Sequence, residues 1–528
     1  MAQMNNTVDV EHVYKPEIKD ANRISVQPEV KATTPKHSPV DYATTPSSVK
    51  NYTFTPIWAA KSDKANESAP RRFVTIGGGT EGNLLGRAAV GFELNKKHIF
   101  DIKAGLSGHN AKVSHFNFDD EEWKSRFYTT TASAGYEFRM NPETSILVNA
   151  EYESQVFNYQ QDMWVNPSYF VTDKQHNTLA KFSASITPYK IGDFSIAGGA
   201  EYEMFSQKYK TIFDEKCSEG VFSANANMEY KFNSTNSIDL AVTFANTSYS
   251  KGIDGYTDIG ARPHYRWHND NMSVKAGLYI GTLGIAPDIN FTYHMSQALD
   301  IYADITGGEA CANTFRAITA ANPYWALAAD NGDFSMKQQF NQLSALAGIR
   351  FRPIEGLSVD ANTGYELSKD RMEFAPASNG TNVYAPVFFA DGNRFFINAN
   401  ASYTYKNRLS VNMSNQFNVW SIDSDNAADL NDVLWRPILD LDWSASFRII
   451  GGLRAGADFR LQTFKDKKEY DYTRPATVNL GASLSYTLSR LPLTVYVKGN
   501  NLLNQDYDNY FMYKAPGINI LAGAAITF

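Results

Sequence analysis

The chain has 528 residues, of which 43% are apolar, 13% aromatic and 20% charged, and its net charge is −7. Its mean hydropathy is −0.38 and no run of about 18 apolar residues occurs, which excludes a helical membrane protein. The negative charge argues against a general nucleic-acid-binding protein, and two cysteines are too few for a disulfide scaffold. A membrane β-barrel stays open, because its alternating strands average to a polar composition.

The first 71 residues differ in composition from the rest of the chain. They contain seven of the 20 prolines, at positions 16, 28, 35, 39, 46, 56 and 70. Each proline removes a backbone donor and favours extended geometry in the residue before it. We therefore predict that residues 1–71 form an extended or disordered periplasmic arm. Its recurring apolar residues could dock as an added strand inside a barrel, or on a periplasmic or lipoprotein partner; they are Val8, Val10, Val13, Tyr14, Ile18, Ile24, Val26 and Val30.

No secretory signal is visible at the start of the numbering. Met1, Ala2 and Gln3 lead directly into polar sequence, without the apolar core of a signal peptide. We interpret the chain as the mature form left after signal-peptide removal, because an Ala-Gln start is typical of the region next to a cleavage site. Export would be in doubt if Met1 were the native start.

From residue 72 onward the sequence alternates between apolar and polar residues in stretches of about 9 to 15 residues, which is the period of β-strands. In one stretch Leu439 and Leu441 share a face, and Asp440 lies on the opposite face. The next stretch repeats the pattern after a turn at 451–452. The pattern predicts pairs of strands joined by tight turns.

Ten such turns occur, at 95–97, 141–142, 191–192, 234–235, 269–270, 296–297, 355–356, 406–407, 451–452 and 490–491. The other connections are usually longer and rich in Asp, Asn, Gly and aromatics, for example 108–124, 159–175, 307–338, 371–392 and 503–514. Ten hairpins, with a first strand near 72–80 and a last near 515–528, predict about 22 strands. We expect residues 72–528 to form an all-β, transmembrane antiparallel β-barrel with short periplasmic turns and long extracellular loops.

A soluble β-sandwich, propeller or solenoid would also have many alternating strands. Two features favour the membrane. The polar faces carry Ser, Thr, Asn, Gly and paired charges, which suit a water-filled lumen. Aromatic residues such as Tyr128, Tyr136, Phe291 and Tyr486 collect near strand ends, as in the girdles at membrane interfaces. We therefore expect the apolar faces to contact outer-membrane lipid.

The end of the chain carries a family resemblance. Its last strand alternates strictly and ends in an aromatic residue, through Ile518, Ile520, Ala522, Ala524, Ile526 and Phe528. This ending resembles the strand by which bacterial outer-membrane proteins are recognised for insertion. The stretch 495–507, followed by 515–517, resembles the final hairpin and loop of TonB-dependent receptor barrels. The resemblance implies a location in the bacterial outer membrane and a role in transport or ligand uptake.

The chain departs from that family before its barrel. The plug domain of a TonB-dependent receptor is larger than the 71 residues present here, so we expect none. The sequence is therefore similar to plugless, TonB-receptor-like barrels of Bacteroidota, a similarity also suggested by residues 14–21. No TonB box is evident, and energised uptake is not carried over from the family.

Three glycines fit the spacing of a dinucleotide-binding loop, namely Gly77, Gly79 and Gly82. The residues that follow, 84–94, alternate like a strand and cannot direct a helix N-terminus at a pyrophosphate. We expect the glycines to mark a bend or the close approach of another backbone, and we predict no cofactor.

His264, Arg266 and His268 share one face of a predicted strand, with Tyr265 and Trp267 on the other. A metal or proton site in the lumen is conceivable there. The spacing is loose, however, and an arginine lies between the two histidines. We therefore expect a lumen wall or a turn at these residues, and we predict no metal site.

Several strands carry acidic and basic residues on their polar faces: Asp300, Asp304, Asp440, Asp442 and Asp458, with Arg448, Arg454 and Arg460. They could act as general acid and base or contact a substrate, but barrels commonly place cross-strand charge pairs there. No HExxH or GxSxG motif occurs. We expect structural pairing, assign no catalytic residue and predict that the protein is not an enzyme.

The two cysteines, Cys217 and Cys311, both fall in predicted extracellular segments. A disulfide that ties two loops together is chemically reasonable in that compartment. The sequence gives no distance between them, so the pairing stays open.

Three functions are compatible with these predictions. The first is a passive or partner-gated conduit, because a barrel this wide has an aqueous lumen that loops, the arm or another protein must occlude. The second is a non-transporting subunit of an outer-membrane assembly or secretion complex, with the arm as its partner-binding segment. The third is a TonB-dependent transporter whose plug is supplied by another chain. Receptor-like transport and the subunit role are favoured about equally.

Overall fold

The computed structural model describes residues 72–114, 122–159, 175–208, 216–250, 253–310, 313–327, 335–374, 385–406, 408–423, 435–465, 474–511 and 513–528. The predicted arm, residues 1–71, lies outside the described residues, so its conformation and its partner stay predictions. No helix in the described part of the chain is long and apolar enough to cross a membrane.

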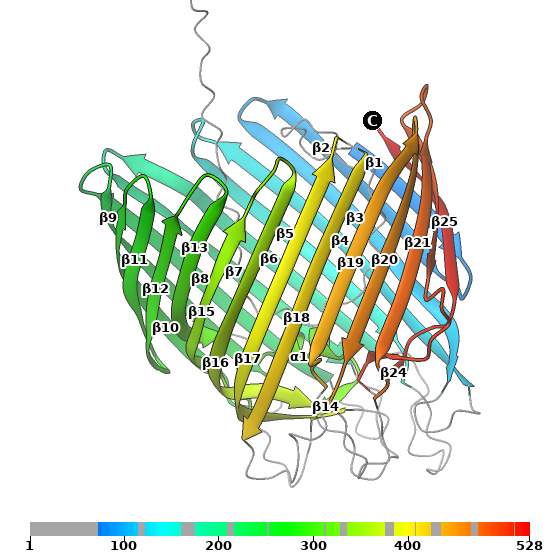
Figure 1. Cartoon of the computed structure of the whole chain (residues 1–528). Helices are drawn as coiled ribbons and strands as arrows, with labels where there is room; N and C mark the ends of the chain where they lie inside the picture. Colours follow the sequence, from blue (N-terminus) through cyan, green and yellow to red (C-terminus); the bar gives the residue numbers. More distant parts are fainter. Residues whose placement is uncertain are drawn as a thin grey trace, which may run out of the picture. The chain divides into compact units, whose positions relative to one another are not determined.

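The described residues form a closed antiparallel barrel of 22 strands, the number that the sequence predicts (Figure 1). The strands are β1 (Arg72–Gly79), β2 (Leu84–Asn95), β3 (His98–Ser114), β4 (Glu122–Arg139), β5 (Ser145–Phe157), β6 (Gln175–Ile191), β7 (Phe194–Lys208), β8 (Lys216–Lys231), β9 (Asn236–Tyr249), β10 (Tyr256–His268), β11 (Met272–Gly281), β12 (Gly284–His294), β13 (Leu299–Ala310), β15 (Gln339–Phe351), β16 (Leu357–Phe374), β17 (Ala385–Tyr405), β18 (Leu409–Asp423), β19 (Leu439–Ile450), β20 (Leu453–Thr463), β21 (Thr477–Thr487), β22 (Leu493–Asn500) and β25 (Asn519–Thr527). Pairing of β1 with β25 closes the barrel, with Phe73 opposite Thr527.

All ten predicted tight turns lie between paired strands, and all lie at one end of the barrel, where β1 begins and β25 ends. Their sequences explain their tightness. Asn95, Asn141, Asn233 and Asn269 each accept hydrogen bonds on the side-chain oxygen from backbone N–H groups two and three residues later, at 2.7–3.1 Å. The side-chain oxygen thus accepts hydrogen bonds from turn N–H groups that have no neighbouring strand to bind. We call this the turn end, and the opposite end the loop end.

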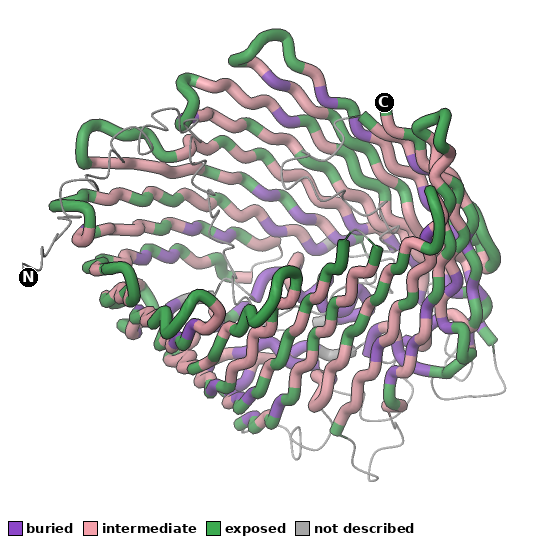
Figure 2. Tube along the Cα trace, turned by 45° about the horizontal axis from the view of Figure 1, so that its top comes forward, coloured by how far each residue is buried: buried purple, intermediate pink, exposed green. Residues whose placement is uncertain are grey.

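The apolar faces of the strands point outward, as expected for a barrel in lipid. On β19 the side chains of Trp443 and Phe447 are 37% and 48% exposed, whereas Arg454 and Arg460 on the neighbouring β20 are buried. Figure 2 shows this alternation of more and less exposed residues along strand after strand. A soluble sandwich would bury the apolar set, so this pattern identifies a transmembrane barrel with a polar interior.

The loop end differs from the sequence prediction in two respects. β3 runs to Ser114 and β16 to Phe374, so strands extend into segments predicted as loops. Parts of two predicted loops are also folded. Segment 307–338 contains helix α1 (Phe315–Ala321) and strand β14 (Trp325–Leu327), which pairs in parallel with β17. Segment 503–514 contains the small hairpin of β23 (Asp508–Tyr510) and β24 (Tyr513–Lys514).

Candidate functional site

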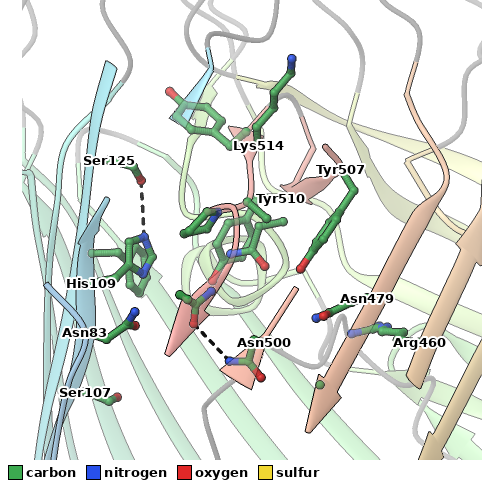
Figure 3. Close-up of a pocket in the computed structure, with 18 of the residues that line it drawn as sticks. Asn83, Ser107, His109, Ser125, Arg460, Asn479, Asn500, Tyr507, Tyr510 and Lys514 are labelled. Carbon is green, nitrogen blue, oxygen red and sulfur yellow. Dashed lines mark hydrogen bonds between the residues drawn. The ribbon is translucent and has the colours of Figure 1, made fainter. Parts of the chain in front are cut away.

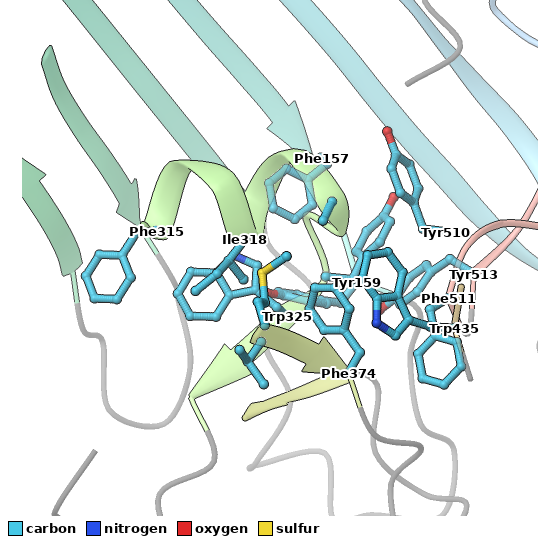
Figure 4. Packing of buried hydrophobic residues seen from close by; sticks show 14 of the residues in the cluster. Phe157, Tyr159, Phe315, Ile318, Trp325, Phe374, Trp435, Tyr510, Phe511 and Tyr513 are labelled. Atoms are coloured by element: carbon cyan, nitrogen blue, oxygen red, sulfur yellow. The ribbon is translucent and has the colours of Figure 1, made fainter. Parts of the chain in front are cut away.

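The folded loop segments pack together at the loop end. We call α1, β14, β23 and β24, together with residues 322–324 and Phe511, the lid. Figure 4 shows its apolar side chains packed against one another and against the ends of barrel strands. The buried residues of this cluster are Ala111, Val113, Trp123, Phe157, Tyr159, Phe205, Cys217, Phe315, Ile318, Ala321, Tyr324, Trp325, Met336, Met372, Phe374, Val387, Trp435, Tyr510, Phe511 and Tyr513. It is the largest of the apolar clusters found among the described residues and lies at the loop end of the barrel.

Stacking and hydrogen bonding join the two halves of the lid. The rings of Tyr324 and Tyr513 lie parallel, with their centroids 3.4 Å apart and their planes at 4°. The buried side chain of Asn322 donates to the Phe511 carbonyl oxygen at 3.4 Å. Within the first half, the Trp325 indole N–H donates to Thr319 Oγ1 at 2.8 Å. Because residues from both segments bury one another, the lid forms as one unit.

One side of the lid is anchored on the strands β7 and β8. The carboxylate of Glu219 accepts hydrogen bonds from the backbone N–H groups of Phe315 at 2.6 Å and of Arg316 at 2.9 Å. The Arg316 guanidinium in turn forms an ion pair with Glu203. Thr314 caps the helix by accepting from the Ala317 N–H at 3.0 Å. Glu219 therefore satisfies the free donors at the start of α1, which is also the positive end of the helix.

The lid also contacts β16, far around the barrel from β8. Phe374 at the end of β16 packs edge-on against Trp435, with ring centroids 4.9 Å apart, and both rings belong to the lid cluster. The fully buried Glu373 accepts from the Trp435 indole N–H at 2.6 Å and from Arg436 Nε at 3.1 Å. Arg371 lies 3.7 Å from the same carboxylate. The lid thus contacts β8 through α1 on one side, and on the other side it contacts β16 through the cluster that includes Phe374 and β17 through its pairing with β14.

A cavity of about 430 Å³ lies between the lid and the inner wall. Figure 3 shows it between β3 and β4 on one side and β20 to β22 on the other. Its lining combines aromatic rings, amides, hydroxyls and charges: Asn83, Ser107, Gly108, His109, Ser125, Phe127, Thr129, Glu153, Gln155, Tyr324, Asp442, Ser444, Asp458, Phe459, Arg460, Asn479, Gly481, Lys498, Asn500, Tyr507, Asn509, Tyr510, Tyr513, Lys514, Ala515, Pro516 and Asn519. We call this cavity the lumen pocket. Its volume is within the range of small-molecule sites.

The cations of the lumen pocket each lie near a carboxylate. Arg460 is 3.6 Å from Asp440, Lys498 is 3.8 Å from Asp458, and Lys514 is 3.7 Å from Asp506. The distances are those of loose ion pairs, which neutralise one another across the strands. Two further acids line the pocket, Glu153, which accepts from Gln155 Nε2 at 2.9 Å, and Asp442, so the pocket is polar and carries charges of both signs.

The stretch that carries the family resemblance has a structural role beside this pocket. Asn501 adopts a left-handed conformation, with φ of 48°. Its amide group donates to the carbonyl oxygens of Gln505 at 2.9 Å and Pro516 at 3.1 Å, and accepts from the Gln505 N–H at 2.9 Å. Asn501 thereby fixes both ends of the segment that carries β23 and β24. The sequence singled out this stretch by resemblance, without indicating that it supports a lid.

The glycine motif is explained by the barrel seam. A Cβ atom on Gly79 would lie 1.9 Å from the carbonyl oxygen of Ile520 on β25, and Gly82 has a φ of +60°. The expected close approach of another backbone is therefore confirmed. The element after the motif is strand β2, as predicted.

The His264 region forms part of the lumen wall. His264 Nδ1 lies 2.8 Å from the Asp239 carboxylate, and its Nε2 lies 3.0 Å from that of Asp288. Arg262 binds Asp288 at 2.8 Å, and Arg266 pairs with Asp239. Within the described ranges, no group of three or more His, Cys, Asp or Glu residues is arranged to hold a metal ion. These contacts agree with the expected structural wall.

Some of the predicted lumen charges form ion pairs, but not all of these pairs are with the expected arginines. Asp440 is near Arg460, whereas Asp458 is near Lys498. Asp300 pairs with Arg352 and with His294, and Asp304 accepts from Asn290 at 2.9 Å. The strand register is the reason for the different partners, because it places Arg448 opposite Arg454 rather than opposite an acid.

Of the two cysteines, Cys217 is buried within the lid cluster. Cys311 lies outside the described residues, so the question of a disulfide stays open.

Comparison with known proteins supports the fold. No protein-family model matches the sequence, and no curated protein does. Solved structures do match. The FrpB iron transporter from Neisseria meningitidis gives a TM-score of 0.67 at 11% identity, over 88% of this chain and 82% of that one. The ferric enterobactin receptor of Pseudomonas aeruginosa gives 0.64 at 11%, over 88% and 81%.

The ferripyoverdine receptor of the Pseudomonas aeruginosa outer membrane gives a TM-score of 0.61 at 12% identity, over 88% of this chain and 72% of that one. At such low identity the likeness establishes the architecture alone. The chain has the barrel fold of TonB-dependent receptors, as the sequence resemblance predicts.

Proposed function

We propose that the protein is a non-enzymatic barrel of the bacterial outer membrane that works as a gated conduit for a small ligand, with the lid as its gate. One observation carries the proposal: a 22-stranded barrel has a lumen wide enough for water, and the lid at its mouth is held on β8 through Glu219 and on β17 through the pairing of β14. An apolar lid held by hydrogen bonds at its margins can close such a lumen and still be released.

The similar structures agree with a transport role. They are named as an iron transporter and as receptors for ferric enterobactin and ferripyoverdine. The resemblance of the last strands to TonB-dependent receptors points in the same direction. In this proposal the lid provides the occlusion, and a periplasmic or lipoprotein partner at residues 1–71 would be one means of control. The plugless, Bacteroidota-type assignment remains part of the proposal.

Conductance in planar lipid bilayers tests the gate. The comparison is between the full chain and a variant in which residues 313–327 are replaced by a flexible Gly/Ser segment of equal length. We expect the full chain to be closed for most of the recording, and the variant to show large, steady openings. The control is Asn233→Gly, which changes a turn at the opposite end.

Folding of each protein is checked by heat-dependent electrophoretic mobility before recording. A correctly folded lid variant that conducts no better than the full chain would contradict the proposal. A full chain that is permanently open would contradict it as well.

A further inference from the structure

We infer that the outer surface of the barrel, at the loop end of β6, β7 and β8, binds the phosphate-bearing headgroup of a membrane lipid. We call this surface the cationic patch. Its residues are Ser154, His176, Thr178, Ser206, Lys208 and Ser218, and Lys216 lies beside them in the strand register. The inference rests on a position of the barrel in the outer membrane, and it is independent of the gate.

Lys208 lies on the outer face of β7, as the residues before it show. The buried Gln207 donates from Nε2 to the carbonyl oxygen of Pro323 in the lid at 3.5 Å, so the odd-numbered positions at this end point into the barrel. Met204, at an even-numbered position, is exposed on the outer surface. Because successive side chains of a strand point to opposite faces, Ser206 and Lys208 point outward.

The register continues this outer face onto the neighbouring strands. His176 on β6 is the partner of Lys208 on one side, and Lys216 on β8 is its partner on the other. A second row, two residues nearer the turn end, consists of hydroxyl side chains from four adjacent strands: Ser154, Thr178, Ser206 and Ser218. His176 joins the two rows, because its Nε2 lies 2.8 Å from Ser154 Oγ.

The charges on these strands are divided between the two faces. The acids of β5 to β8 all occupy odd-numbered positions, which face the lumen: Glu151, Glu153, Glu201, Glu203, Glu219 and Glu229. The outer face at the loop end therefore has lysine and hydroxyl groups without an acid on the same face of these four strands. Within the described residues Lys208 forms no ion pair.

The register also favours a bound anion. Lys208 and Lys216 occupy directly opposite positions, where like charges repel one another. An anion bound between β7 and β8 would remove that repulsion. The feature is local, because the outer face at the loop end of β17 and β18 instead carries Asp391 opposite Asp423. The cationic patch is therefore a distinct surface of the barrel.

The height of the patch indicates a lipid headgroup as the anion. The exposed residues Tyr202 and Met204 on β7 and Phe222 on β8 belong to the lipid-facing surface of the same strands. Lys208 lies four residues beyond Met204, which is about 14 Å along the strand and about 10 Å along the membrane normal at the usual tilt. That height matches the polar layer above the hydrocarbon core. Lipid phosphates lie in this layer, and lysine binds phosphate as a compact charge.

Native mass spectrometry of the full chain in a nonionic detergent tests the inference. The phosphate-bearing probes are diphosphoryl lipid A and phosphatidylglycerol, and the probe without phosphate is monogalactosyl diacylglycerol. We expect the first two to stay bound and the third to bind no more than background. Lys208→Gln and Lys216→Gln should each weaken binding about 3- to 5-fold, and the double variant about 10- to 25-fold.

Two further variants separate charge from folding. Lys190→Gln removes the same charge at the turn end and should bind like wild type, and Lys208→Arg keeps the charge and should bind within about 2-fold of wild type. Heat-dependent electrophoretic mobility establishes that each variant is folded. Unchanged affinity of the double variant would overturn the inference, as would equal binding of the lipid without phosphate.

Competition with inorganic phosphate distinguishes a lipid site from a general anion site. We expect free phosphate to leave most of the lipid bound, because it lacks the acyl chains that contact Met204 and Phe222. Complete displacement would overturn the assignment to a lipid. The bilayer recordings are separate from these measurements: a working gate without lipid binding rejects the cationic patch alone, and lipid binding without gating rejects the conduit alone.

Discussion

Gly79 on β1 lies so close to Ile520 on β25 that any side chain would collide with the Ile520 backbone. A Cβ at this position would be 1.9 Å from the carbonyl oxygen, whereas a Cβ on the neighbouring Gly78 meets nothing within 4 Å. We expect Gly79→Ala to destabilise the seam by about 1–3 kcal/mol, because backbone atoms must move, and Gly78→Ala to have almost no effect. Denaturation midpoints and the folded fraction on semi-native gels measure both. Equal stability of the two variants would disprove this account of the seam.

Glu219 anchors the lid through two hydrogen bonds from backbone N–H groups of α1. A hydrogen bond contributes about 0.5–1.5 kcal/mol, so we expect Glu219→Ala to free the helix and raise the rate of trypsin cleavage after Arg316 about 10-fold. Glu229→Ala, on the turn-end part of the same strand, is the control. Identical cleavage of the two variants would show that Glu219 does not hold the lid.

Glu373 is buried among Arg371, Arg436 and Trp435. Its removal leaves buried donors and positive charge without their acceptor, which costs about 3–5 kcal/mol. We expect Glu373→Ala to lower the denaturation midpoint clearly, monitored by tryptophan fluorescence. The exposed Glu143–Lys190 pair, at 2.6 Å, is the comparison, and Glu143→Ala should cost less than about 1 kcal/mol. A similar cost for both variants would contradict the buried network.

Asn501 combines a left-handed backbone with three side-chain hydrogen bonds. Asn501→Gly loses the side-chain hydrogen bonds, but glycine tolerates the left-handed backbone. Asn501→Ala loses the hydrogen bonds and also strains the backbone, so we expect it to be about 1 kcal/mol less stable than Asn501→Gly. Chymotrypsin cleavage after Tyr507 reports on this segment. We expect the cleavage rate to increase from wild type to Asn501→Gly and again to Asn501→Ala. Faster cleavage of Asn501→Gly than of Asn501→Ala would refute the role of the left-handed backbone.

Burial raises the pKa of Tyr324 well above its usual value of 10.0, and the neighbouring Tyr510 and Tyr159 add to the shift. The neutral phenol is therefore favoured in the folded lid. The contribution of the neutral Tyr324 phenol to the free energy of unfolding is fully present below pH 10. It is lost as the pH rises from 10 toward the raised pKa, because the phenol ionises first in the unfolded state. Tyr324→Phe should lose less stability above pH 10 than wild type. Parallel stability curves for the two proteins would contradict this.

The barrel could be predicted from the sequence, because its signals are local. Alternation with a period of two sets the inner and outer faces, and residues such as Asn95 and Gly451 mark turns within a few positions. The strand number and all ten tight turns are confirmed for this reason. The sequence predicted that acidic and basic residues pair across strands in the lumen, but it did not predict the partners correctly. The strand register determines which acid lies opposite which base, and the sequence does not give the register. Asp458 near Lys498 is an example.

The lid could not be predicted in the same way. Contacts such as Tyr324 with Tyr513 and Asn322 with Phe511 join segments that have no periodic pattern and lie far apart in the chain. One signal was present: Tyr324, Trp325 and Tyr510 are large aromatics in segments predicted as exposed loops. Large aromatic residues are highly buried on average, so their presence in two predicted loops is the signal by which an apolar core at that end could have been found.

Pairing of β1 with β25 also has a consequence for assembly. Every other neighbouring pair in the barrel joins strands that are consecutive or nearly so, but this pair joins the first strand to the last. Until that pairing is made, the growing sheet has two unpaired edges that are competent to aggregate. Closure over such a sequence separation is intrinsically slow. We therefore expect the folding chain to need a chaperone that covers both edge strands of the sheet until they pair.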